Sequence, residues 1–135
     1  MYHCIMLVIQ WRKEEKMDFI FEMDRPIYIQ LVEQLKLYII TGKLVSGSRI
    51  PSVRDFAMQA KVNPNTMQKA LIELEEEGLI YTERTNGKFV TENKELIQNM
   101  KKNLAQKTGE EYLNAMKKIG VSKEEAIKYL QELEN

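Results

Sequence analysis

The chain has 135 residues, 44% of them hydrophobic and 30% charged, and its 20 basic and 20 acidic side chains give a formal net charge of zero at pH 7. This length allows one modest domain with an appendage but not two full domains. The composition is typical of a soluble globular protein, and no apolar run approaches the roughly 20 residues that span a membrane, so we expect a cytoplasmic protein without a membrane partner.

A neutral total argues against a nucleic-acid partner, but the charges are unevenly distributed along the chain. The segment from Arg49 to Lys69 contains four basic residues and a single acid, Asp55. Four glutamates then follow within residues 73–77. A domain that includes this segment can therefore present a basic face.

The residues that most enzyme chemistry requires are scarce. His3 and Cys4 are the only histidine and the only cysteine, so the body of the chain cannot form a catalytic thiol, a His-assisted serine triad or a Cys/His zinc site. The sequence also has no glycine-rich phosphate loop and no carboxylates clustered away from a helix face. It therefore predicts no enzyme activity, no cofactor and no metal.

Residues 1–16, MYHCIMLVIQWRKEEK, precede a second methionine, Met17. They do not form a secretory signal, because the apolar run at residues 4–9 is short and the positive charge follows it. Trp11 and Arg12 can be encoded TGG-AGG, which contains the bacterial ribosome-binding string GGAGG. We therefore assign residues 1–17 to a leader or disordered extension, with Met17 as the natural start. A genuine N-terminal strand or helix is the alternative.

The first predicted helix of the body begins at Pro26 and ends at Gly42. A second, short helix is predicted for residues 53–60, with Ser52 as its N-cap and Asp55 three residues on, in the manner of a capping box. The apolar residues of the first helix recur at helical spacing and comprise Ile27, Leu31, Leu35 and Ile39, with Tyr28, Val32 and Tyr38 beside them.

The stretch VNPNTMQKALIELEEEG, residues 62–78, predicts a third helix. Asn63 is its N-cap, and Pro64 occupies the first helical position, where the missing N–H costs nothing. The carboxylates gather at the other end, up to Glu77, which works against the helix dipole. We infer that something that disfavours negative charge approaches the N-terminal end. The expected buried stripe is Met67, Ala70, Leu71 and Leu74.

Two runs that alternate in strand fashion, LIYTER and KFVTE, flank Thr85-Asn86-Gly87, and Asn-Gly is the strongest short-range hairpin signal. The order helix, short helix, turn, helix, hairpin predicts a winged helix-turn-helix. We therefore predict a mainly α fold with a small β-hairpin wing, in which residues 18–92 form the winged helix-turn-helix domain.

Residues 93–135 form a predicted helical tail, in which Gly120 separates two helices and Ser122 caps the second. Two helices with this many apolar residues cannot bury them alone, so dimerisation is favoured over packing of the tail on the winged domain. The methionines of the tail are expected to fill gaps in the core rather than to bind a cofactor. The predicted dimer interface consists of Ile97, Met100, Leu104, Leu113 and Met116.

The stretch from Pro26 to Val90 resembles the GntR family of bacterial transcription regulators. The resemblance rests on PIYIQLVEQL, TGKLVSGSRIPSVRDFA, VNPNTMQKALIELEEEGLI and NGKFV, in family order and spacing. The VNPNT form and the short helical tail look most like the YtrA subfamily. The resemblance implies a homodimer that binds a pseudo-palindromic operator in double-stranded DNA, usually as a repressor, and in this subfamily often beside transporter genes.

The resemblance also implies which residues contact DNA. Arg54 matches an arginine early in the second helix of the family, and Gly87, followed by Lys88, matches a wing-tip glycine that approaches the minor groove. Many family members carry arginine in place of Pro64 and Gln68. Because arginine suits guanine and glutamine suits adenine, the operator is expected to differ from the better-known family consensus. The start of the third helix contributes Asn63, Pro64, Asn65, Thr66 and Gln68.

Each of these residues also has a simpler interpretation. Arg54 could pair with Asp55 or a neighbouring acid on the surface, although both phosphate and base contacts favour arginine. Thr66 could merely cap its helix, and Gln68 could lie on a solvated face. Gly87 could serve only the turn, which needs a positive φ. Two further bases are predicted as generic phosphate contacts or plain surface, namely Arg49 and Lys69.

Residues 92–135 are too few for the ligand-binding domains that most members of the family append. A small-molecule effector, of unknown identity, would therefore use a small pocket at the helical interface or the wing. The slightly acidic middle of the chain favours one alternative function, a winged helix that binds protein or RNA.

Overall fold

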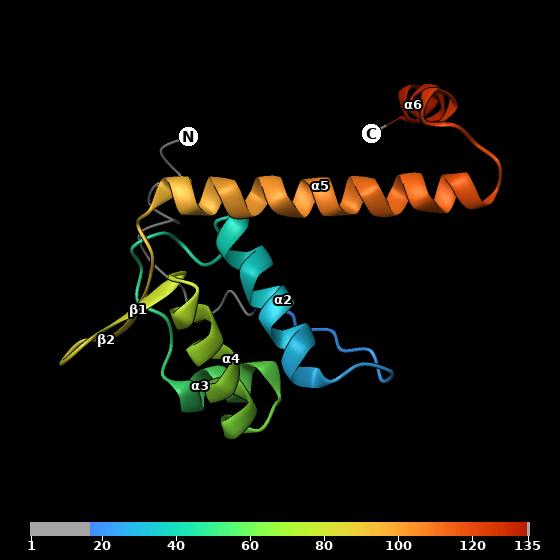
Figure 1. Cartoon of the computed structure of the whole chain (residues 1–135). Coiled ribbons are helices and arrows are strands. Elements are labelled where there is room, and N and C mark those ends of the chain that lie inside the picture. The colour runs from blue at the N-terminus through green and yellow to red at the C-terminus, as the bar shows by residue number, and fades with distance from the viewer. Residues whose placement is uncertain (1–16, 135) are drawn as a thin grey trace. The chain divides into compact units, whose positions relative to one another are not determined.

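The computed structural model of the protein describes residues 17–134, which divide into two compact units, one ending at Ile97 and the other beginning at Gln98 (Figure 1). The predicted leader, residues 1–16, lies outside the described residues. Met17, which the sequence assigns to the end of that leader, is only 2% exposed and is part of the core of the first unit.

Helix α2 spans Ile27–Ile40 and confirms the first predicted helix. Ile27, the first of the apolar residues at helical spacing, is 44% exposed. The buried face begins one turn later, where Gln30, only 2% exposed, occupies its first position. The buried apolar residues of α2 are Leu31, Val32, Leu35 and Ile39.

Gln30 and Gln34, one turn apart on α2, bind the backbone of the N-terminal arm, which we define as residues 18–25. The side-chain amide of Gln30 accepts a hydrogen bond from the N–H of Glu22 at 2.6 Å and donates one to the carbonyl of Glu22 at 2.9 Å. The amide of Gln34 makes the same pair of bonds with Ile20, at 3.1 Å and 2.6 Å. A buried glutamine is satisfied in this way, because its donor and its acceptor are both used.

Helices α3, Val53–Ala60, and α4, Pro64–Glu76, both begin at the predicted N-caps. The hydroxyl of Ser52 accepts a hydrogen bond from the N–H three residues on, at 3.2 Å. The amide oxygen of Asn63 accepts one from the N–H two residues on, at 2.8 Å. Helix α4 ends one residue before the predicted end. Its predicted buried stripe is confirmed and consists of Met67, Ala70, Leu71 and Leu74.

The wing is the antiparallel hairpin of β1, Ile80–Glu83, and β2, Gly87–Val90, in which Glu83 lies opposite Gly87. The predicted turn is corrected in one respect: Gly87 is the first residue of β2 and does not belong to the turn. The N–H of Asn86 donates to the carbonyl of Glu83 at 3.2 Å, and Gly87 follows with a φ of 98°. The connection between the strands is therefore residues 84–86, and three-residue connections are among the common hairpin loops.

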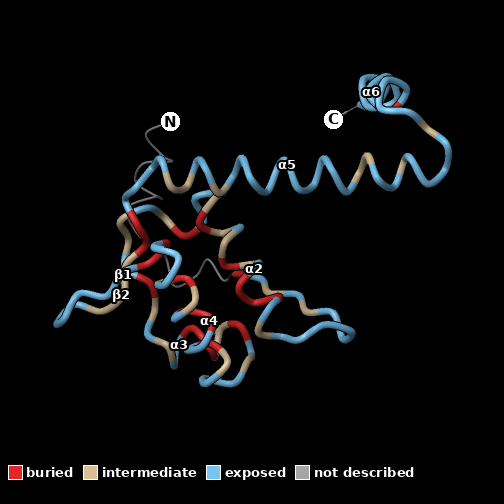
Figure 2. The backbone as a smooth tube through the Cα atoms, viewed as in Figure 1, coloured by how far each residue is buried: buried red, intermediate tan, exposed pale blue. Residues whose placement is uncertain are grey.

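Helix α5, Lys94–Lys118, continues from the first unit into the second, where Lys123–Glu132 form α6. Ser122 caps α6 as predicted, since its hydroxyl accepts from the N–H three residues on at 3.2 Å. The hydroxyl of Tyr112 donates to the carbonyl of Ala126, at 3.2 Å. Buried residues are concentrated in the first unit, whereas α5 has none along its length (Figure 2). None of the helices within residues 17–134 is long and apolar enough to cross a membrane.

Candidate nucleic-acid interface

The first turns of α4 expose polar side chains opposite the buried stripe of that helix. The first turn contains no acidic residue, and the glutamates of α4 all lie in its second half. Because the first N–H groups of a helix carry partial positive charge, this end of α4 suits a phosphate or another electron-rich group. The predicted contacts here are exposed, except for the half-buried Thr66, and comprise Asn63, Pro64, Asn65, Thr66 and Gln68.

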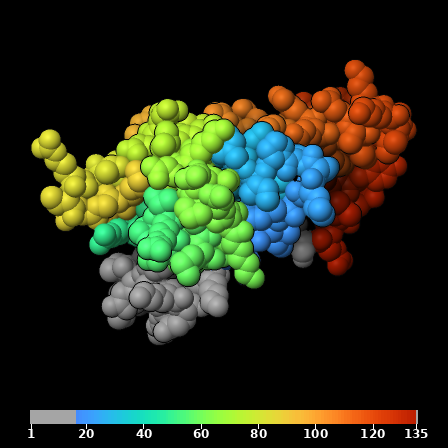
Figure 3. Space-filling view, turned by 90° about the horizontal axis from the view of Figure 1, so that it is seen from below, coloured from blue at the N-terminus to red at the C-terminus, as the bar shows by residue number. Residues whose placement is uncertain are grey.

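Arg54 is the second residue of α3 and is exposed. It takes part in none of the ion pairs found among residues 17–134, so the simpler interpretation, a pair with Asp55, is not realised. Helix α3 packs against α4. The space-filling view shows the atoms of these two helices together on one face, with the hairpin projecting beside them (Figure 3). Arg54 therefore lies on a helix that packs directly against α4.

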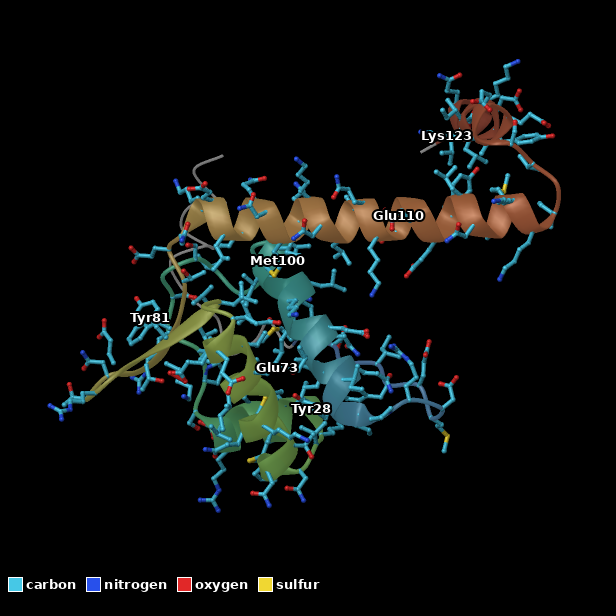
Figure 4. All side chains as sticks on the ribbon, viewed as in Figure 1. Tyr28, Glu73, Tyr81, Met100, Glu110 and Lys123 are labelled. Carbon is cyan, nitrogen blue, oxygen red and sulfur yellow. The ribbon has the colours of Figure 1, made fainter. Side chains whose placement is uncertain are left out.

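Lys69 on α4 is turned toward α2. Its Nζ lies 4.2 Å from the centroid of the Tyr28 ring, which is a cation–π contact. The hydroxyl of Tyr28 donates to Oε1 of Glu73 at 2.7 Å, and this hydrogen bond raises the pKa of the Tyr28 hydroxyl. Figure 4 shows Tyr28 and Glu73 on the facing helices α2 and α4. Lys69 is thus engaged within the first unit, and we expect only a weak contribution from it to phosphate binding.

Lys88 is held on the inner face of the wing, toward α4. Its Nζ lies 3.1 Å from Oε1 of Glu75 and donates to the hydroxyl of Thr82 at 2.9 Å. The hydrogen bond from Thr82, followed by that from Lys88, lowers the pKa of the Glu75 carboxyl. The sequence did not indicate this network, because Glu75 and Lys88 belong to different elements. The ammonium of Lys88 is therefore paired within the first unit.

The five predicted interface residues do not form one stripe on α5. Leu113 follows Leu104 by about two and a half turns of helix, so the two side chains leave α5 on opposite sides. Leu104 is 38% exposed. Leu113 lies next to Tyr112, whose hydroxyl binds α6. Ile97, Met100, Leu113 and Met116 are all partly exposed. Exposed apolar residues continue on α6 and at its C-cap, with exposures of 43% to 69%, at Ile127, Tyr129, Leu130 and Leu133.

Replacement of Glu75 by glutamine is expected to strengthen binding to DNA of any sequence by about two- to fivefold, the size of one exposed ion pair. The substitution removes the carboxylate that holds Lys88 and leaves its ammonium free for a phosphate. The measurement is a gel-shift titration over a range of salt concentrations, and its salt slope should steepen by about one. Glu76→Gln is the matched control, because Glu76 is exposed on the same helix. Equal gains in the two variants would point to net charge rather than to release of Lys88.

Three packed helices followed by a hairpin, with a helix start that lacks acids, define a winged helix-turn-helix protein, as predicted. The family model described as "Bacterial regulatory proteins, gntR family" matches residues 27–90. The chain is 37% identical over 111 residues to the "Uncharacterized HTH-type transcriptional regulator YhcF" of Bacillus subtilis (strain 168), which covers 82% of this chain and 92% of that protein. The chain therefore belongs to the GntR family of bacterial transcriptional regulators.

The resemblance to the YtrA subfamily is supported as well. The chain is 44% identical over 68 residues to the "HTH-type transcriptional repressor YtrA" of Bacillus subtilis, over 50% of this chain and 52% of that protein. These relatives are transcriptional regulators and not enzymes, which confirms the prediction that the chain is not an enzyme.

Two solved structures extend the comparison. The "GntR family transcriptional regulator from Listeria monocytogenes" has a TM-score of 0.79 and 38% identity, over 84% of this chain and all of that one. The DNA-binding domain of AraR in complex with an operator has a TM-score of 0.51 and 26% identity, over 58% of this chain and all of that one. The winged unit therefore has the fold of a domain that has been solved on its operator.

Proposed function

We propose that this chain is a dimeric repressor that binds a pseudo-palindromic operator in double-stranded DNA and acts in the cytoplasm. The observation that carries the proposal is the acid-free start of α4, together with an exposed Arg54 on the adjoining α3 that forms no ion pair within residues 17–134. We infer that this helix start enters the major groove, with Arg54 on its flank and the wing on the adjacent minor groove. In this proposal residues 18–92 bind DNA and the tail, residues 93–135, holds two copies together.

The exposed side-chain amides of α4 are the groups that read the bases in this proposal. Asn65 and Gln68 are exposed, and both side chains can pair with the donor and acceptor that adenine presents in the major groove. Pro64 has no side-chain donor for guanine. We therefore infer an operator whose half-sites contain adenine at the positions that α4 reaches. We propose repression, rather than activation, because the relatives YtrA and NagR are both described as repressors. We propose the operon next to its own gene, with transporter genes in it, as the target.

The proposed dimer uses the apolar surface of the tail. Ile97, Met100 and Leu104 leave one side of α5, where no residue is buried within the chain. Burial of these apolar side chains against a second copy removes them from water and so stabilises a dimer. A two-fold dimer also supplies two copies of α4, which a palindromic site requires.

Arg54→Ala is expected to weaken operator binding by about 1 to 3 kcal/mol, because one arginine contact of this kind contributes about that much. The measurement is a gel shift against the DNA upstream of the chain's own gene, at several salt concentrations. Lys69→Ala is the comparison variant. Its loss of affinity should be about the same for every DNA sequence and smaller than that of Arg54→Ala. The salt slope should flatten by no more than about one.

Two results would contradict the proposed function. One is a wild-type chain with equal affinity for operator and unrelated DNA. The other is preferential binding to RNA of the same sequence, which would favour the alternative of an RNA-binding winged helix.

A further inference from the structure

The loop that precedes α3 pairs with β2 on the side away from β1. Arg49 lies opposite Phe89 of β2 in an antiparallel bridge, and two backbone hydrogen bonds of 2.9 Å flank that bridge. Residues two apart on a strand point to the same face. Arg49, Phe89 and Gly87 therefore share the outer face of the wing, whereas Lys88 belongs to the inner face.

On the outer face, the guanidinium of Arg49 crosses the bare backbone of Gly87. A Cβ on Gly87 would lie 3.0 Å from Nε and 3.2 Å from Nη2 of Arg49. Gly87 is closer to the turn than Phe89, so Arg49 extends toward the tip of the hairpin. Phe89 in turn stacks on Tyr81, with the ring centroids 5.7 Å apart, and Figure 4 shows Tyr81 on the hairpin. The lack of a side chain at Gly87 thus provides the space that Arg49 occupies.

The two bases that flank Gly87, Lys88 and Arg49, differ in how their charges are balanced. Lys88 is paired with Glu75 and bonded to Thr82. Arg49 is exposed and takes part in none of the ion pairs among the described residues, 17–134. Of these two bases, Arg49 is the one whose charge is available to a partner.

We propose that Arg49 is the side chain that the wing inserts into the minor groove and that Gly87 positions it there. This inference rests on the proposed DNA-binding function. Narrow minor grooves of A·T-rich DNA have an enhanced negative potential that attracts arginine. The minor groove also distinguishes A·T from G·C rather than all four base pairs. The protein therefore prefers A·T-rich sequence on the outer side of each half-site, at positions that α4 does not touch.

The φ of 98° at Gly87 could by itself explain a glycine there, since side chains rarely adopt such a conformation. Gly42 separates the two explanations. Its φ is 79°, and a Cβ on it would meet nothing within 4 Å. Gly42→Ala therefore carries the backbone strain of such a substitution without a clash, and serves as the matched control for Gly87→Ala.

The experiment uses the full chain and an operator selected from random double-stranded DNA by the wild type. Affinities are measured for the wild type, Arg49→Ala, Arg49→Lys, Gly87→Ala, Gly42→Ala and the double variant Arg49→Ala/Gly87→Ala. Each is tested on the selected operator with A·T flanks and with G·C flanks. Thermal unfolding of each variant shows the folded fraction.

Arg49→Ala is expected to lose about 5- to 100-fold in affinity on A·T flanks, the range for one well-placed arginine, and no more than about threefold on G·C flanks, where only a surface charge is lost. Arg49→Lys should resemble Arg49→Ala, because an ammonium is more strongly hydrated and lacks the planar fork. Gly87→Ala should cost a similar factor alone and almost nothing further in the Arg49→Ala background. Gly42→Ala should bind like the wild type.

Equal losses on both flanks would overturn the proposal, since Arg49 would then be a generic phosphate contact. Additive effects of Arg49→Ala and Gly87→Ala would overturn the role of Gly87. If Gly87→Ala does not fold, the comparison of flanks with Arg49→Ala alone still decides the role of Arg49. A wild type that selects no DNA sequence would instead refute the proposed function itself, and this inference with it.

Discussion

A chain that ends at Ile97 is expected to keep a folded winged unit and to lose about 10² to 10⁴ in operator affinity, because linked modules gain that much without new contacts. Ile97 is a better end point for this truncation than Glu92, the predicted last residue of the winged domain. Leu96 still belongs to the first unit, where its Cδ2 lies 3.5 Å from the position of a Cβ on Gly78. Two copies of α4 must reach major grooves about 34 Å apart, and only a rigid two-fold interface fixes that separation.

Sedimentation should find the truncated chain monomeric, and gel shifts should find it insensitive to changes in half-site spacing. Leu104→Lys tests the same interface in the full chain, since Leu104 leaves α5 on the same side as Ile97 and Met100. Gln106→Lys is its matched control, because it adds the same charge about half a turn away, on the opposite side of the helix. A truncated chain that still sediments as a dimer would move the interface into the winged unit.

Phe56→Ala is expected to lower the free energy of unfolding by about 3 to 5 kcal/mol, the usual cost of removing a buried aromatic ring. Phe56 on α3 has no exposed surface. Its ring meets that of Phe19 edge-on, with the centroids 6.0 Å apart. The substitution therefore leaves a cavity where α3 meets the N-terminal arm. Since a small domain is stable by only about 5 to 15 kcal/mol, much of the population should unfold on mild heating.

Urea unfolding followed by circular dichroism measures this loss. Met58→Ala is the control on the same helix, because Met58 is 72% exposed and a surface change of this kind costs about 0.5 kcal/mol or less. Phe56→Leu should fall between the two, since leucine fills part of the space. An unfolding midpoint of Phe56→Ala equal to that of Met58→Ala would contradict the packing described for α3.

The sequence predicted the features that depend on neighbouring residues. The caps at Ser52, Asn63 and Ser122 are all present, because an N-cap needs only its own side chain and an N–H two or three residues away. The buried stripe of α4 was predictable for the same reason, since helical spacing alone determines which residues share a face.

Features that depend on distant residues were not predictable. Nothing in the local pattern indicates that Lys88 is bound by Glu75, or that Arg49 lies across Gly87, because these pairs meet only when the hairpin packs on α4 and on the loop before α3. The exposure of Ile27 has a similar origin. Its spacing fits the stripe of α2, but the buried face of that helix starts at Gln30, whose amide binds the N-terminal arm.

The contacts of Lys69 have a consequence for the entropy of binding. A free lysine side chain loses up to about 2 kcal/mol of rotamer freedom when a partner orders it. Here the ring of Tyr28 and the hydrogen bond from Tyr28 to Glu73 already restrict this flank of α4. The ordering cost of these side chains is thus met during folding rather than at association, which is the advantage of a preorganised surface. A partner that meets this flank of α4 therefore finds side chains that are already ordered, and the entropy lost on association is smaller.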